Sequence, residues 1–133
     1  MKRITKHIGV TLLLCAPLCA LAADLARGAR LFGSRCASCH SVGPSARAGF
    51  GPHLNGIFGK RAGSAPDFRY SPAMAKSGIV WNDKTLAAFL DDPDDVVPGT
   101  KMRFWGMSNA GQVADLLVYL RSFQASTAQS GQR

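Results

Sequence analysis

The sequence predicts a small all-α domain, with about four helices joined by long loops rich in glycine and proline. Strand-like alternation of apolar and polar residues is scarce, whereas apolar residues recur at helical spacing in several segments. Residues 43–66 hold six of the 14 glycines and three of the seven prolines of this 133-residue chain. Loops this long are uncommon in a compact domain, so we expect them to pack against a large buried group.

The amino terminus has the parts of a secretory signal peptide. A basic start precedes an apolar run over residues 8–20, and Ala20-Leu21-Ala22 has the small-x-small pattern that signal peptidase reads. We expect residues 1–22 to be removed rather than kept as an anchor, because the run is too short to span a bilayer. The mature chain, residues 23–133, is then one exported domain without a membrane segment, and residues 124–133 form a flexible polar tail.

The first helix is expected to begin at an Asp24 N-cap and to run into Cys36. Its apolar face carries Leu25, Ala29 and Phe32. Gly28 lies near this face, and a glycine inside a helix costs about 1 kcal/mol relative to alanine. Either the helix tolerates a weak position, or Gly28 lets another helix approach closely.

Three further helices follow the loop region. Ser71-Pro72 begins a short helix that Gly78 ends, and Asn82 begins a longer one that Pro93 stops. Asn109 can cap the last helix. The apolar faces of the last two helices, which we interpret as core, are Leu86, Phe89 and Leu90 in one and Val113, Leu116, Leu117 and Leu120 in the other.

The segment Cys36-Ala37-Ser38-Cys39-His40 is the most informative part of the chain. C-x-x-C-H is the attachment site of a c-type haem, in which two thiols bond the haem and the histidine binds its iron. A thioredoxin-like dithiol would need a βαβ surround, and a zinc site would need a second pair of ligands, which no other cysteine of the mature chain supplies. The sequence therefore predicts one covalently bound haem c, with Cys36 and Cys39 as attachment sites and His40 as an axial ligand.

The second axial ligand has four candidates: His53, Met74, Met102 and Met107. Met102 follows a Pro98-Gly99 turn, after which an extended chain can aim a thioether at a buried iron. Methionines more often fill cores, and this is our interpretation of Met74 and Met107. The turn favours Met102, whereas spacing alone leaves the other candidates open.

Four segments resemble the class I c-type cytochromes, in their mitochondrial-like bacterial branch. They are CASCH, GPHLNGIFGKRAG, GIVW and PGTKMRF, in the order and with the separations of that family. The resemblance covers residues 24–123, nearly all of the mature chain. It implies the small cytochrome c fold, wrapped around one haem c.

The resemblance also implies roles for particular residues. Met102 would be the second axial ligand opposite His40, and the Pro52 carbonyl would accept a hydrogen bond from the His40 ring, which fixes the ring and tunes the iron. Tyr70 and Trp81 would hydrogen-bond a buried haem propionate. Further pocket positions are Lys60, Met74, Phe89 and Phe104.

Three of these pocket positions depart from the family pattern. Phe89 stands where many relatives have a tyrosine near the methionine sulfur, and Met74 stands where the family has an asparagine. Both changes remove a polar group, so we expect a drier pocket. Lys60 replaces an arginine near the propionates and keeps the charge without the bidentate fork.

The charge distribution suggests a docking surface for redox proteins. The formal net charge of +8 falls to +5 when residues 1–22 are removed, and a positive balance favours acidic partners. Arg35, Lys101 and Arg103 flank Cys36 and Met102, and should lie near the exposed haem edge. No basic helix or aromatic platform of a nucleic-acid-binding protein is found, so nucleic acid is excluded as a partner.

An acidic cluster complicates this basic surface. Asp91, Asp92, Asp94 and Asp95 follow the third helix, and carboxylates at a helix carboxyl end oppose its dipole. They form either a solvated turn around Pro93 or, with the basic residues, a docking face of mixed charge, to which we assign Asp94 and Asp95.

These features together predict a periplasmic electron carrier, a monomer that docks transiently with donors and acceptors and is not an enzyme. The alternative is a dedicated cytochrome subunit of a periplasmic dehydrogenase, with the same haem chemistry and a tighter interface. A gas sensor or peroxidase ranks last, because no distal acid–base pair accompanies His53, the one unassigned histidine.

Overall fold

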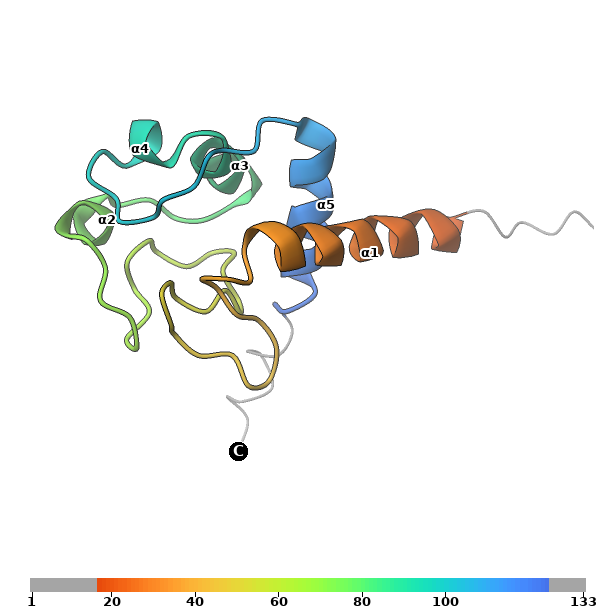
Figure 1. Ribbon diagram of the computed structural model, residues 1–133, viewed down its shortest axis with the longest axis horizontal. Helices are drawn as coiled ribbons and strands as arrows, with labels where there is room; N and C mark the ends of the chain where they lie inside the picture. The colour runs from red at the N-terminus through yellow and green to blue at the C-terminus, as the bar shows by residue number, and fades with distance from the viewer. Residues whose placement is uncertain (1–16, 125–133) are drawn as a thin grey trace, which may run out of the picture.

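A computed structural model describes residues 17–124, in which five helices and no regular strand are found. The helices are α1 (Pro17–Arg35), α2 (Pro72–Lys76), α3 (Asp83–Asp91), α4 (Pro93–Val96) and α5 (Ala110–Arg121). Two long helices, α1 and α5, cross steeply. The shorter helices α2, α3 and α4 lie on the side toward which the carboxyl end of α1 points (Figure 1). The predicted all-α class is confirmed, with one helix more than expected.

The crossing of α1 and α5 depends on Gly28. A Cβ atom there would overlap the Asp115 carbonyl oxygen and lie 2.7 Å from the Tyr119 Cβ. Beside it, the Phe32 and Tyr119 rings are 5.5 Å apart, and Arg27 Nε donates to Asp115 Oδ2 at 2.7 Å. Close approach by another helix is therefore the reason for this glycine.

The amino end of α1 differs from the expectation. The helix begins at Pro17, so Asp24 lies inside it and does not cap it; its carboxylate instead pairs with Arg27, one turn further along. The residues before Asp24 are mostly alanine and leucine, which favour helix, so the backbone continues through the expected start. Residues 1–16, most of the predicted signal peptide, lie outside the described residues.

The other helix starts are confirmed. The side-chain oxygens of Ser71, Asn82 and Asn109 each accept a hydrogen bond from the backbone N–H three residues further on, at 3.0–3.1 Å. The predicted apolar faces of α3 and α5 are buried. Gly78, at φ 72°, follows the end of α2 as expected.

The acidic cluster does not form a simple turn. The Asp92 carboxylate accepts a hydrogen bond from the Asp95 N–H at 3.0 Å and so caps α4. Asp94 and Asp95 therefore lie in the first turn of a short helix, where negative charge is favourable. The expectation that Asp94 and Asp95 oppose the dipole of α3 at its carboxyl end was wrong. Pro93 stops α3 and at the same time begins α4.

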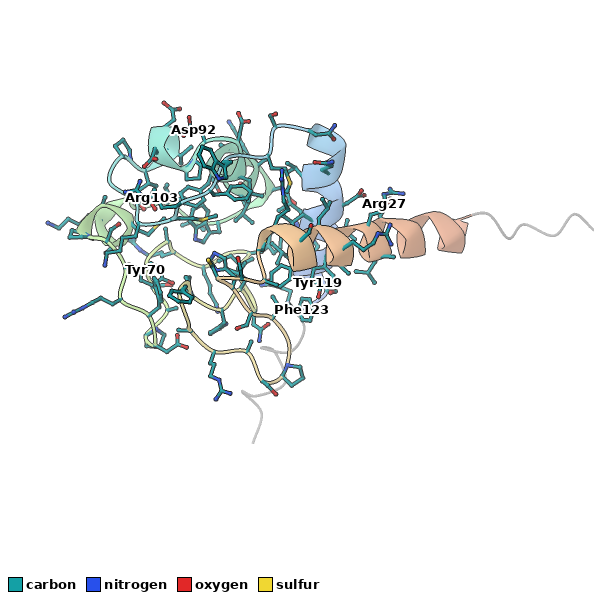
Figure 2. The ribbon with its side chains drawn as sticks, in the orientation of Figure 1. Arg27, Tyr70, Asp92, Arg103, Tyr119 and Phe123 are labelled. Atoms are coloured by element: carbon teal, nitrogen blue, oxygen red, sulfur yellow. The ribbon has the colours of Figure 1, made fainter. Side chains whose placement is uncertain are left out.

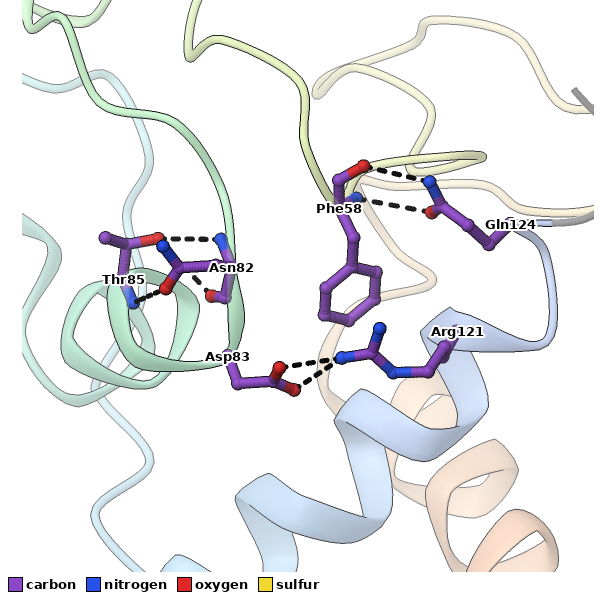
Figure 3. A network of polar contacts seen from close by, with 6 residues as sticks. All are labelled: Phe58, Asn82, Asp83, Thr85, Arg121 and Gln124. Atoms are coloured by element: carbon purple, nitrogen blue, oxygen red, sulfur yellow. Dashed lines mark hydrogen bonds and ion pairs between the residues drawn. The ribbon is translucent and has the colours of Figure 1, made fainter.

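A polar network ties the end of α5 to α3 and to the loop region (Figure 3). Arg121 donates to both Asp83 carboxylate oxygens at 2.7 Å, and its guanidinium lies 4.0 Å from the centre of the Phe58 ring. The Gln124 amide donates to the Phe58 carbonyl at 2.9 Å and accepts from its N–H at 3.3 Å. Two hydrogen bonds therefore join Gln124, the first residue of the expected tail, to the loop region, and residues 125–133 lie outside the described residues.

The core occupies the space between the loop region and the last three helices. In Figure 1, the segment from residue 36 to 71 lies on one side, with α3, α4 and residues 97–109 on the other. Among residues 17–124, no helix combines the length and apolarity needed to cross a bilayer.

Candidate haem site

A cavity of about 430 Å³ lies between the loop region that follows α1 and the later helices of the chain. Its volume is within the range of about 300–1,000 Å³ typical of cofactor and ligand sites. Its wall comes from the loop after α1, from α2, α3 and α5, and from the segment before α5. The cavity therefore joins parts of the chain that are distant in sequence.

The C-x-x-C-H segment lies on this wall. Tight turns continue α1 into it: the Cys36 N–H donates to the Phe32 carbonyl at 2.9 Å, and the His40 N–H donates to the Cys36 carbonyl at 2.8 Å. Both cysteines line the cavity, Cys36 buried and Cys39 exposed. Burial raises the pKa of the Cys36 thiol to about 11, although the nearby Arg35 opposes this shift.

The His40 ring is oriented for metal binding. Its Nδ1 donates to the Pro52 carbonyl oxygen at 2.8 Å, which assigns the proton to Nδ1 and leaves the Nε2 lone pair for a metal. Burial lowers the His40 pKa, and the hydrogen bond to Pro52 offsets this only in part. The ring is therefore held neutral, as a ligand must be.

Gly51 makes room for this ring. A Cβ atom at position 51 would lie 2.6 Å from Cε1 and 2.8 Å from Nδ1 of His40. The His40 ring thus occupies space that any side chain at position 51 would fill, next to the Pro52 carbonyl that orients the ring.

Met102 reaches the cavity through a tight turn. The Thr100 N–H donates to the Val97 carbonyl at 2.9 Å across Pro98-Gly99, and Gly99 has φ 91°, which glycine adopts without strain. The Thr100 side chain is buried and its Oγ1 accepts from the Met102 N–H at 3.3 Å. Of the four ligand candidates, Met102 and Met74 line the cavity, whereas His53 and Met107 do not.

Most of the other predicted pocket residues also line the cavity: Pro52, Tyr70, Trp81, Phe89 and Phe104. Trp81 and Phe89 are buried and their ring centres are 5.2 Å apart. Burial raises the Tyr70 pKa, so this side chain stays a protonated donor. Phe89 and Met74 are buried and present apolar surface to the cavity, in line with the expected dry pocket.

Lys60 is not on the cavity wall; its Nζ donates to the Asn55 carbonyl at 2.9 Å. Conversely, the sequence analysis missed several lining residues, among them Gly51, Phe68, Ser71 and Thr100. Gly51 and Thr100 belong to the segments GPHLNGIFGKRAG and PGTKMRF, which carry the resemblance, but no role was assigned to either residue. Phe68 lies in an irregular loop where no sequence pattern marks it.

The charged residues assigned to docking lie at two adjoining places. Arg35, Lys101 and Arg103 line the cavity and are exposed. Arg103 pairs with Asp94 at 3.6 Å, a contact between two exposed side chains. Figure 2 shows Arg103 on the same side of the molecule as Tyr70 and the Asp92 turn.

The cavity fits a covalently attached haem. Two thiols, a neutral imidazole with a free nitrogen and a thioether lie on the wall of one largely apolar cavity. Over residues 25–124, the chain matches the family model described as Cytochrome c.

This chain belongs to the cytochrome c family.

Its relatives include proteins named cytochrome c2 and cytochrome c. Cytochrome c2 of Rhodomicrobium vannielii is 46% identical over 99 residues, 74% of this chain and 78% of the relative. Cytochrome c2 of Blastochloris viridis is 42% identical, over 80% and 83% of the two chains. Cytochrome c of Gibberella zeae is also 42% identical, over 74% and 92%. The protein is a class I c-type cytochrome of the bacterial branch, with one covalently attached haem c.

Proposed function

We propose that this cytochrome c is an electron carrier that exchanges one electron at a time with redox proteins. The observation that carries the proposal is the single cavity that Cys36, Cys39, His40 and Met102 line together. The haem iron supplies the ferrous–ferric couple, and His/Met ligation raises its potential. The protein makes and breaks no substrate bonds and is therefore not an enzyme.

The chain's own residues keep the site rigid. The Pro52 carbonyl holds the His40 ring at 2.8 Å, while buried Thr100 holds the backbone of Met102. We infer that His40 and Met102 would hold the haem iron, and that Tyr70 and Trp81 would donate hydrogen bonds to a haem propionate. A site fixed in this way changes little between oxidation states, as fast electron transfer requires.

Carbon monoxide tests whether Met102 fills the sixth position. A titration of the reduced, haem-loaded protein at neutral pH should leave the visible spectrum unchanged, because a bound thioether excludes the gas. Met102→Ala should bind carbon monoxide readily, and its potential should fall by part of the range of about 0.8 V that axial ligands set.

The matched control is Met107→Ala, which removes a buried methionine from outside the cavity wall. This variant should still exclude carbon monoxide. Rapid binding by the wild-type protein would contradict the proposal and favour a gas sensor or peroxidase. The names of the relatives, cytochrome c2 and cytochrome c, favour an independent carrier over a dehydrogenase subunit.

We also infer that partners dock on a face of mixed charge, formed by Arg35, Lys101 and Arg103 together with Asp94 and Asp95. The ion pair between Arg103 and Asp94 supports this proposal, since it joins the two charge types in one surface. Neutralising the acids with Asp94→Asn and Asp95→Asn should slow oxidation of the reduced protein by respiratory membranes several-fold at low salt, and much less at high salt.

The control for this experiment changes net charge equally at another place. Gln112→Lys with Ala114→Lys adds two positive charges at exposed positions of α5. If both double variants behave alike, only net charge matters and the mixed face is wrong. We propose that the carrier acts in the periplasm as a monomer; the predicted signal peptide supports the location.

A further inference from the structure

The segment from Lys101 to Trp105 has two different faces. Met102 and Phe104 are partly buried and line the cavity, whereas Lys101, Arg103 and Trp105 are exposed. This alternation is that of an extended chain with one face toward the core and one toward solvent. The segment that supplies the axial thioether therefore also presents an outer face with two cations and an indole.

Trp105 is the least expected member of this face. Its relative exposure is 104%, so the folded protein covers none of this large apolar side chain. Tryptophan is seldom left uncovered in a protein that functions alone, and it is enriched among the residues that dominate protein–protein binding.

The exposure of Trp105 does not come from a loose loop. On one side of the segment, Thr100 is 3% exposed. On the other, Met107 is also 3% exposed, and its N–H donates to the Leu90 carbonyl at 2.7 Å. Between them Gly106, at φ 89°, brings the backbone against the Asp91 carbonyl at the end of α3. The indole is thus presented from a fixed backbone, which lowers the entropic cost of binding.

The charges around the indole indicate the kind of partner. Arg103 is paired with Asp94 of α4, and the Lys101 Nζ lies 3.5 Å from the Arg69 carbonyl. Asp91, at the end of α3, adjoins the segment through the contact of its carbonyl with Gly106. Basic and acidic groups thus flank the same apolar side chain, a combination that an anionic lipid surface would repel in part.

We propose that Trp105 is the apolar anchor of the docking surface and inserts into an apolar pocket on the redox partner, a protein with carboxylates opposite Lys101 and Arg103. The charged residues around it orient the partner, and the indole supplies contact that salt does not screen. This inference rests on the proposed electron-carrier function, and it adds a residue that does not line the haem cavity.

The test compares two oxidants of the reduced, haem-loaded protein. Respiratory membranes from the organism that encodes it require docking, whereas ferricyanide, a small ion, requires no docking surface. The rates are measured at about 0.01 M and about 1 M salt, where the screening length is about 30 Å and 3 Å. Leu25→Ala serves as the control, because Leu25 is an exposed apolar residue on α1 with 39% exposure.

Trp105→Ala should slow oxidation by membranes about ten-fold or more at both salt concentrations, with the ferricyanide rate and the potential unchanged. Trp105→Phe should recover part of the rate, and Leu25→Ala should change neither rate. Arg103→Gln should slow the membrane reaction at low salt only. An unaltered membrane rate in Trp105→Ala, or an equal loss with ferricyanide, would overturn the inference.

Two further measurements distinguish a redox partner from a lipid surface or a second copy of the chain as the molecule that covers Trp105. Binding to vesicles of phosphatidylglycerol and phosphatidylcholine that Trp105→Ala abolishes would assign the indole to a lipid surface instead. A dimer of the wild-type protein that this variant dissociates would assign it to a second copy. A wild-type protein that ferricyanide oxidises but membranes neither oxidise nor reduce would remove the carrier function itself, and the inference with it.

Discussion

Gly51→Ala should produce a protein that loses its normal haem ligation. The new Cβ would lie 2.6 Å from Cε1 of His40, well inside contact distance. The ring cannot retreat easily, because its Nδ1 is bonded to the Pro52 carbonyl and its backbone is fixed by the turn from Cys36. We expect a shifted potential, carbon monoxide binding and a lower yield of haem-loaded protein.

The control for Gly51→Ala is two residues away. A Cβ at Gly49 would have its closest neighbour, the Cys39 carbonyl oxygen, at 4.0 Å, and neither glycine has the positive φ that disfavours alanine. Gly49→Ala should therefore keep the wild-type spectrum and potential. If Gly51→Ala also kept the wild-type spectrum and potential, the position of the His40 ring would not depend on the space that Gly51 leaves free.

Gly28→Ala should be the most destabilising single-methyl change in α1. The added Cβ would overlap the Asp115 carbonyl and crowd Tyr119, so the two helices must move apart. Overpacking of this kind typically costs 1–3 kcal/mol, and alanine's better helix propensity returns about 1 kcal/mol. We expect the free energy of unfolding in urea to fall by up to about 2 kcal/mol.

Gly33→Ala provides the opposite case on the same helix. A Cβ there meets nothing within 4 Å, so the gain in helix propensity should act alone and raise stability by up to about 1 kcal/mol. The two variants change the same helix by the same atom. Equal effects would mean that the crossing of α1 and α5 is not tight.

Local sequence patterns predicted the helices that have their own caps. Short polar side chains satisfy the first free N–H groups of three helices, at Ser71, Asn82 and Asn109. Each of these helix starts is therefore determined by neighbouring residues in the sequence. The start of α1 was missed because its expected cap lies in a segment that is itself helix-forming. The short helix α4 was missed because Asp92 serves two helices at once.

The chemistry of the site was also readable in the sequence. C-x-x-C-H is a contiguous pattern, and its meaning depends on bonds between neighbouring residues and one haem. Met102 was a favoured candidate among four, and the resemblance to cytochromes c selected it. Met102 and Met74 both lie on the cavity wall, which Met107 and His53 do not reach, so Met102 as the ligand stays a prediction.

The sequence by itself determined the cofactor, the helical class and most helix starts, because these depend on short-range patterns. Only the tertiary structure decided which glycines are indispensable, since Gly28, Gly33, Gly49 and Gly51 look alike until the atoms around them are known. It also placed Lys60 on the Asn55 carbonyl and Asp94 on Arg103, and it left Trp105 uncovered. The two contacts join residues that are separated in the sequence, and the exposure of Trp105 depends on which face of its segment points to solvent. All three are fixed by how the helices and loops close around the cavity.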